Sequence, residues 1–102
     1  MRFRPPWRKR ACERARTLCI LSRDGPTVVG IVNGMTDGEV TYLCDLYVLE
    51  KYRGQGRGKE LLQQFLKAAE GTTIVLLTSE ASGFYEKFGF VRREAMVWKG
   101  DK

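Results

Sequence analysis

The chain contains no histidine, and its cysteines form no metal-binding or disulfide pattern. Cys12, Cys19 and Cys44 are the three cysteines among 102 residues, and no two of them stand in a CxxC motif. Zinc sites are built largely from Cys and His, and disulfide-stapled domains carry a dense, even set of cysteines. The composition therefore argues against a metal site and a disulfide framework, and it favours a reducing compartment such as the cytoplasm.

Long apolar segments are also lacking. No apolar run reaches the roughly 20 residues that a membrane-spanning helix needs. No short apolar segment followed by small residues marks a secretory signal. We find no internal repeat and no linker, and the length predicts one small domain without membrane association.

Residues 17–102 carry no net charge. They hold eleven basic and eleven acidic side chains, whereas residues 1–16 hold seven Arg or Lys against Glu13, so the net charge of +6 lies in the N-terminal segment. We interpret residues 1–16 as a basic arm without stable structure and residues 17–102 as the folded domain. The alternative for the arm is attraction to nucleic acid or another acidic partner. The neutral domain and the lack of a recognition helix or aromatic RNA motif argue against nucleic acid.

Turn residues divide the first half of the domain into three predicted strands. The segments Arg23-Asp24-Gly25-Pro26 and Thr36-Asp37-Gly38 contain residues typical of tight turns. Strands are expected over residues 17–22, 27–35 and 39–49, with Gly30 and Gly34 marking a close approach or a bulge. Short turns between consecutive strands predict an antiparallel meander.

The third predicted strand is apolar on both faces. Regular alternation places Leu43, Asp45 and Tyr47 on one face, and Cys44, Leu46 and Val48 on the other. We therefore expect this strand to be covered on both sides, with Asp45 as a partly buried exception.

The second half of the domain predicts a crossover. A helical stripe precedes Gly71, a typical helix end, and consists of Leu61, Leu62, Phe65, Leu66 and Ala69. Residues 72–78 predict a buried strand, residues 80–88 a helix capped by Ser79, and residues 90–99 a final strand or hairpin. The predicted fold class is α/β with a mixed sheet, in which an antiparallel meander precedes a βαβ crossover, a second helix and C-terminal strand(s).

A glycine-rich turn joins the third strand to the first helix. Residues 53–59 read RGQGRGK, with three glycines that let main-chain N–H groups converge at the positive end of a helix. This arrangement suits a diphosphate, and three basic side chains add charge. The spacing does not match the P-loop, the dinucleotide fingerprint or the kinase loop. The alternative interpretation is a plain turn with solvated charges.

Two motifs together resemble the GNAT superfamily, the Gcn5-related N-acetyltransferases. Arg53, Gly56 and Gly58 fit the family's loop pattern, and the segment ASGFYEKFGF fits its later pattern through Ala81, Phe84, Tyr85, Gly89 and Phe90. The resemblance runs from about Thr17 to Trp98 and is strongest to small bacterial members. Each motif alone is moderately specific, whereas both in this order, about thirty residues apart, are strongly specific.

The resemblance implies acetyl-CoA as cofactor and an N-acetyltransferase activity by direct attack of a primary amine, without a metal. It implies that main-chain amides of the loop hold the diphosphate, and that the strand end pairs with the pantetheine arm where it splays from residues 74–78. The implied cofactor-binding residues are Leu46, Tyr47, Val48, Arg53, Gly54, Gln55, Gly56, Arg57, Gly58 and Lys59. A strand N–H near Leu46 or Tyr47 would polarise the thioester carbonyl.

Two residues are candidates for proton transfer. The resemblance implies that Tyr85 protonates the leaving thiolate, which a neutral phenol can do; the alternative is an aromatic core residue. We select Asp45 as the base because burial would raise the pKa of its carboxyl. The alternative for Asp45 is a structural carboxylate that accepts hydrogen bonds from a turn or an arginine.

The segment before Thr17 is short compared with full-length family members, in which a strand and two helices shape the acceptor pocket. Three explanations stay open: a partner subunit covers the sheet, the chain is a fragment, or the protein binds CoA without efficient catalysis. The arm could also cover its own sheet through Phe3 and Trp7. We favour a homodimer, because an uncovered sheet face is a large apolar patch. The acceptor is a small-molecule or peptide amine that the sequence does not define.

Overall fold

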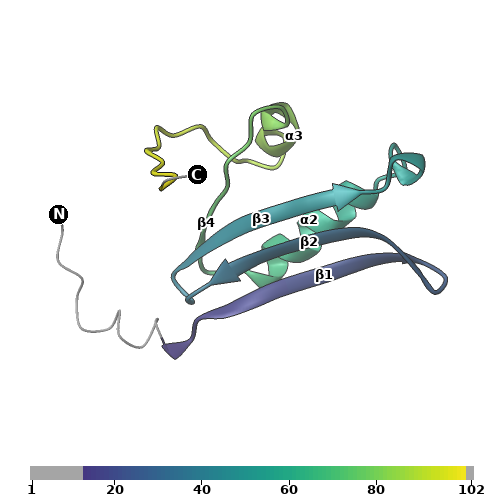
Figure 1. Ribbon diagram of the computed structural model, residues 1–102, viewed down its shortest axis with the longest axis horizontal. Helices are drawn as coiled ribbons and strands as arrows, with labels where there is room; N and C mark the ends of the chain where they lie inside the picture. The colour runs from purple at the N-terminus through teal and green to yellow at the C-terminus, as the bar shows by residue number, and fades with distance from the viewer. Residues whose placement is uncertain (1–12, 101–102) are drawn as a thin grey trace.

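The computed structural model describes residues 13–100, and most of the predicted arm, residues 1–12, lies outside this range (Figure 1). A single sheet has the strand order β1-β2-β3-β4, in which the first three strands are antiparallel and β4 is parallel to β3. The predicted meander and crossover are therefore confirmed. The elements are β1 (Arg16–Asp24), β2 (Thr27–Thr36), β3 (Val40–Val48), the 3₁₀ helix η1 (Glu50–Tyr52), α2 (Arg57–Ala68), β4 (Thr73–Val75) and α3 (Ser82–Glu86).

Both hairpin turns follow from their sequences. Gly25, between β1 and β2, has φ 60°, and Gly38, between β2 and β3, has φ 88°; glycine reaches this region without strain. The Asp37 carboxylate accepts from the N–H groups of Glu39 and Val40 at 2.8 and 2.9 Å. The turn residues thus fix the two reversals that place β2 between β1 and β3.

The core lies between α2 and one face of the sheet (Figure 1). Phe65 and Leu62 are fully buried, and they pack with Val32, Leu43 and other members of the cluster. Gly34 permits this packing, because a Cβ there would lie 2.8 Å from Phe65 Cζ. The close approach predicted at this glycine is confirmed. Burial of each large apolar side chain contributes about 1.5–3 kcal/mol to folding.

A β-bulge in β3 overturns the predicted alternation. The register with β2 shifts between Asn33, which lies opposite Asp45, and Gly34, which lies opposite Leu43, so that Cys44 is the extra residue. A bulge reverses the faces of the residues that follow. Leu43 and Val48 are consequently both buried, whereas Cys44 and Asp45 are exposed. The prediction that both faces of this strand are covered is wrong.

The sheet face opposite α2 carries exposed apolar side chains. Met35 is 53% exposed, and Tyr42, which lies opposite Met35 in the register of β2 and β3, is 36% exposed. Tyr47 on β3 is 52% exposed. We call this surface the open face. Its apolar character agrees with the expectation that the strands lack cover on one side.

The C-terminal third is less regular than predicted. β4 has three residues, and α3 has five with Ala81 as its N-cap, where Thr78 Oγ1 and not Ser79 accepts from the Ala81 N–H. Residues 90–100 form no strand, and Trp98 is 89% exposed. The prediction of a final strand is wrong, because β propensity requires a neighbour to pair with and β4 ends at Val75. No helix within residues 13–100 combines the length and the apolar character that a bilayer-spanning helix requires.

Candidate acetyl-CoA site

The site begins where β3 and β4 part. The two strands pair only from Val40–Thr73 to Tyr42–Val75, and beyond this point β3 continues for six residues with β2 as its only strand neighbour in the described chain. The main chain of Leu43 to Val48 therefore has an open edge on the side of β4. An unpaired strand edge can form a ladder with any extended group that carries amides.

The antiparallel register decides which residues present main-chain groups to this edge. The Leu49 N–H donates to the Val29 carbonyl at 2.8 Å, so the Ile31–Tyr47 pair, two residues away, is also a hydrogen-bonded pair. The N–H and C=O of Tyr47 are thus hydrogen bonded to β2. The N–H and C=O groups of Leu46 and Val48 point toward the open edge. Of the two N–H groups predicted to polarise a carbonyl, the one of Leu46 is available there.

The glycine-rich loop follows β3 after the short helix η1. Gly54 has φ 76° and Gly56, the N-cap of α2, has φ 83°. A Cβ at either position would meet no heavy atom within 4 Å, so both face open space. Glycine is required here by the backbone conformation and not by crowding. The loop ends in the unpaired N–H groups of the first turn of α2, where an anion is favoured.

Arg53 is bound to the end of β3. Its Nε donates to the Val48 carbonyl at 2.8 Å, and its guanidinium lies 5.2 Å from the centroid of the Tyr47 ring. The side chain therefore fixes the start of the loop against the strand that offers the open edge.

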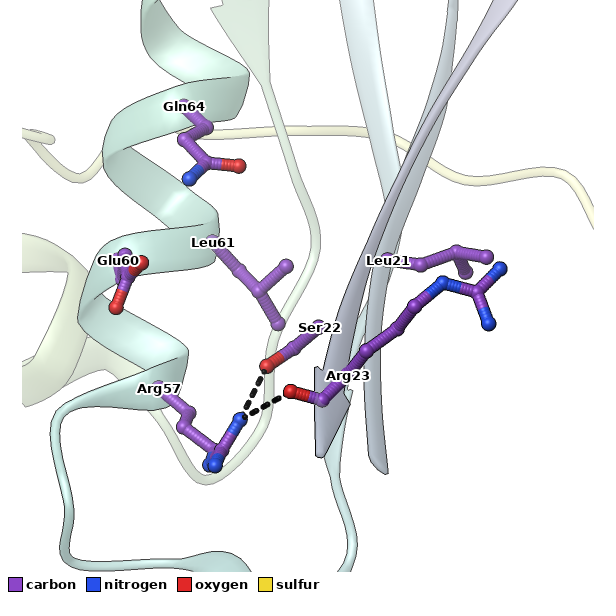
Figure 2. A pocket seen from close by; sticks show the side chains of 7 residues that line it. All are labelled: Leu21, Ser22, Arg23, Arg57, Glu60, Leu61 and Gln64. Carbon is purple, nitrogen blue, oxygen red and sulfur yellow. Dashed lines mark hydrogen bonds between the residues drawn. The ribbon is translucent and has the colours of Figure 1, made fainter. Parts of the chain in front are cut away.

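Arg57 extends away from the loop. Its Nη1 donates to Ser22 Oγ at 3.0 Å and to the Arg23 carbonyl at 3.2 Å, as Figure 2 shows. Its guanidinium also lies 5.2 Å from the centroid of the Tyr52 ring. Lys59 is exposed, so its charge is available at the helix start. Of the three basic side chains expected to add charge at the loop, Arg53 and Arg57 are thus hydrogen bonded to neutral groups of the protein.

A polar hollow of about 160 Å³ lies beside the contact of Arg57 with Ser22 and Arg23. It is lined by residues of β1 and α2, including Ser22, Arg57, Glu60 and Gln64 (Figure 2). No residue of β3 lines it, so it is not the cradle formed by the glycine loop.

Tyr85 joins α3 to the core. Its side chain is 9% exposed and makes edge contacts with Phe84 at 5.2 Å and Phe90 at 5.6 Å between ring centroids. Burial raises the pKa of its phenol above the ordinary value of 10.0, so the side chain keeps its proton at neutral pH. The first turn of α2 lies near α3 and the end of β3. A Cβ at Gly58 in that turn would contact Phe84 Cζ at 4.0 Å and Val48 Cγ2 at 3.9 Å.

Asp45 differs from its prediction. It lies opposite Asn33 at the bulge, on the open face, and it is exposed instead of covered. Among the described residues it accepts no hydrogen bond from a turn or an arginine, so the structural alternative has no support here either. The burial on which its role as a base was argued is absent.

Sequence reasoning missed the residues that anchor the loop. Asp24 was interpreted only as a turn former, yet its carboxylate accepts from the Tyr52 hydroxyl at 2.9 Å, and this contact raises the pKa of that phenol. Ser22 was interpreted only as part of a strand. These contacts span 28 and 35 residues, and no local pattern signals them.

The described residues 14–92 match the acetyltransferase (GNAT) domain family, and this is well over half of the chain. The chain therefore belongs to the GNAT family of acetyltransferase domains.

Within the described range, no group of three His, Cys, Asp or Glu side chains could hold a metal ion.

Two similar proteins agree with this assignment, and a third, more distant one shares the fold. FG08082 of Gibberella zeae, named as a candidate acetyltransferase, is 34% identical over 95 residues, which cover 79% of this chain and 50% of that protein. A candidate GNAT acetyltransferase from Xanthomonas campestris is 29% identical with a TM-score of 0.71, over 83% of this chain and 61% of the other. A candidate acetyltransferase from Clostridium acetobutylicum, crystallised with acetyl-CoA, has a TM-score of 0.70 at 16% identity, over 80% and 62% of the two chains. The chain thus spans half of the fungal protein and about three fifths of the two bacterial ones.

Proposed function

We propose that this protein is an acetyl-CoA-dependent N-acetyltransferase that transfers an acetyl group to a primary amine by direct attack. One observation carries the proposal: the glycine loop at the start of α2 is held by Arg53 against the end of β3, the strand with the open edge. The open edge of β3 can pair with the amides of a pantetheine arm. It lies next to the glycine loop, whose main-chain N–H groups can bind a diphosphate. The family membership and the acetyl-CoA bound to the Clostridium protein support the same cofactor.

The residues present fit this cofactor. The space around Gly54 and Gly56 leaves room for a diphosphate against the main-chain N–H groups of residues 55–59. Leu46 and Val48 offer main-chain groups to the pantetheine amides. The Val48 carbonyl can accept a second hydrogen bond beside that of Arg53, because a carbonyl oxygen has two lone pairs.

The bound cofactor supplies a thioester, and the chain supplies proton transfer and polarisation. The Leu46 N–H can stabilise negative charge on the carbonyl oxygen under attack. Tyr85 holds the proton that a leaving thiolate needs, and its raised pKa keeps this proton in place. Asp45 on the open face is our proposed base, and it would take the proton of the attacking amine directly or through a bridging water.

A catalytically weak CoA-binding relative is the second candidate. The exposure of Asp45 favours it, since a carboxylate in water is a poor base for an ammonium group. Release of CoA thiol from acetyl-CoA in the presence of a panel of primary amines separates the two. The alternative function, nucleic-acid binding, depends on the basic arm. Residues 1–12 of this arm lie outside the described range.

The experiment that tests the cofactor is thermal unfolding with acetyl-CoA, CoA and, as a control, ATP. A ligand at a hundred times its Kd stabilises the folded state by about 2.7 kcal/mol, which for a domain of this size raises Tm by about 10 °C or more. ATP shares the adenine and phosphates but lacks the pantetheine arm, and we expect a smaller shift. Unchanged Tm with both CoA ligands at saturation would refute the proposal.

We further propose that the protein acts in the cytoplasm as a homodimer whose second copy covers the open face. Met35 and Tyr47 are about half exposed there, and exposed apolar side chains on one sheet face can be buried by a second subunit. Light scattering coupled to gel filtration tests this, with Met35→Glu expected to give a monomer. A wild-type protein that elutes as a monomer at high concentration would contradict it.

A further inference from the structure

The glycine loop is anchored by side chains on both of its flanks. Among the described residues, Arg53 binds the end of β3, whereas Tyr52 and Arg57 bind residues 22–24 at the end of β1. Between these anchors, Gly54 and Gly56 face open space. Packing therefore does not hold the shape of the loop at these glycines, and the flanking anchors must do so.

Five residues form what we call the hairpin clamp: Ser22, Arg23, Asp24, Tyr52 and Arg57. The Tyr52 hydroxyl donates to the Asp24 carboxylate at 2.9 Å. Arg57 donates to Ser22 Oγ at 3.0 Å and to the Arg23 carbonyl at 3.2 Å (Figure 2). The stacking of Arg57 on the Tyr52 ring at 5.2 Å joins the two contacts. The clamp thus connects Tyr52, which precedes the loop, and Arg57, which lies within the loop at the start of α2, with the hairpin.

An irregularity in the sheet favours these contacts. The register of β1 and β2 shifts between Ser22 and Arg23, so that Val29 is the extra residue on β2. A bulge twists the strand end and releases main-chain groups from regular pairing. The Arg23 carbonyl, which lies at this shift, accepts from Arg57 at 3.2 Å. On the other edge of β2 the Val29 carbonyl accepts from Leu49 at 2.8 Å and continues the β2–β3 ladder, which fixes the chain before η1.

We propose that the hairpin clamp positions the glycine loop for diphosphate binding, and that Arg57 is a positioning residue instead of a phosphate ligand. The inference rests on the proposed function. Arg57 is the first residue of α2, where a cation could reach an anion at the helix start, yet its guanidinium hydrogen bonds go to the hairpin. Ser22 and Tyr52 belong to the same hairpin clamp and carry no charge, so they test the clamp without a change of charge.

The expected effect follows from conformational populations. A loop with three glycines that loses an anchor samples more conformations, and only some direct its N–H groups to one point. Apparent affinity falls in proportion to the fraction that can bind. Loss of one hydrogen bond corresponds to a change of about three- to tenfold in such an equilibrium.

The test measures the affinity for acetyl-CoA and CoA by calorimetry with the full chain. We expect Ser22→Ala, Tyr52→Phe and Arg57→Gln each to weaken binding by about three- to tenfold and to raise KM while kcat stays the same. Lys67→Gln removes the same charge from the other end of α2 and keeps wild-type affinity. Asp24→Asn retains an acceptor oxygen for Tyr52 and keeps most of the affinity, whereas Asp24→Ala does not.

A second readout uses the free protein. Backbone order parameters of Gly54 and Gly56 from NMR relaxation should fall in Tyr52→Phe and Ser22→Ala, and stay unchanged in Lys67→Gln.

Two results would overturn the inference. Wild-type affinity in both Ser22→Ala and Tyr52→Phe would show that the clamp does not position the site, and a loss confined to Arg57→Gln would make Arg57 a direct phosphate ligand. If the wild type binds neither ligand, the proposed function fails; the order parameters of the free protein then decide whether the clamp fixes the loop.

Discussion

The Arg53 guanidinium is hydrogen bonded to the Val48 carbonyl at 2.8 Å, and this contact joins the glycine loop to the open edge of β3. The glycine loop and the open edge of β3, which together form the proposed site, are thereby fixed relative to each other. The diphosphate cradle cannot move along the strand without breaking a charge-assisted hydrogen bond, which is stronger than a neutral one.

Replacement of Arg53 by methionine should weaken acetyl-CoA binding. Methionine keeps an unbranched side chain over Tyr47 but removes the donor to Val48, so we expect about a three- to tenfold increase in Kd. Calorimetry against Lys67→Met, an exposed residue of α2, controls for the loss of charge. Equal affinity of Arg53→Met and wild type would contradict this role.

The Tyr85→Phe variant should lose turnover while it keeps its fold. The ring contacts with Phe84 and Phe90 are retained, but the proton for the leaving thiolate is gone. General acid catalysis typically contributes about 10²–10⁴-fold, so kcat should fall by at least about 10²-fold with little change in KM or Tm. An unchanged kcat would leave Tyr85 with a packing role alone.

The pH dependence of Tyr85 has a defined sign. Burial raises the pKa of the phenol above 10.0, so the neutral, proton-donating form persists through neutral pH and is lost only above pH 10. We expect the rate, once the amine is neutral, to fall at still higher pH in the wild type. The stabilising contribution of the neutral phenol is likewise full below pH 10 and is lost as the pH rises through the folded-state pKa. The rate of Tyr85→Phe should not show this fall at high pH. Ultraviolet titration of phenolate should detect one fewer tyrosine that ionises at high pH.

Gly34→Ala should destabilise the fold. The new Cβ would collide with the main-chain carbonyl oxygen of Tyr42 and would lie 2.8 Å from Phe65 Cζ, and overpacking of this kind costs about 1–3 kcal/mol. Gly83 in α3 is the matched control, because a Cβ there meets nothing within 4 Å and Gly→Ala in a helix gains about 0.5–1 kcal/mol. Urea unfolding measures both. A Gly34→Ala protein as stable as wild type would disprove the tight packing of β2 against both β3 and α2 at this glycine.

Local signals predicted much of this fold. The turn residues around Gly25 and Gly38 and the apolar stripe through Phe65 act over a few residues, and the elements they predict are present. The buried face of β3 could not be predicted, because alternation holds only while the register is uniform. The bulge at Cys44 depends on how β3 meets Gly34, a residue of another strand.

The site divides in the same way. The loop glycines and Tyr85 have a recognisable local pattern, whereas the partners of Arg57 are set by tertiary folding, which brings the end of β1 to the start of α2. The covered environment expected for Asp45 required regular alternation through the bulge. The final strand expected over residues 90–99 required a neighbour that β4, three residues long, does not provide.

The unpaired edge of β3 also has a consequence for the protein in the cell. A bare strand edge is a template for unwanted association between chains, and native proteins usually cover or charge it. In the proposed complex the pantetheine arm is that cover. The cofactor would then act as an aggregation shield as well as a substrate, and the amount of intact protein would follow the supply of acetyl-CoA.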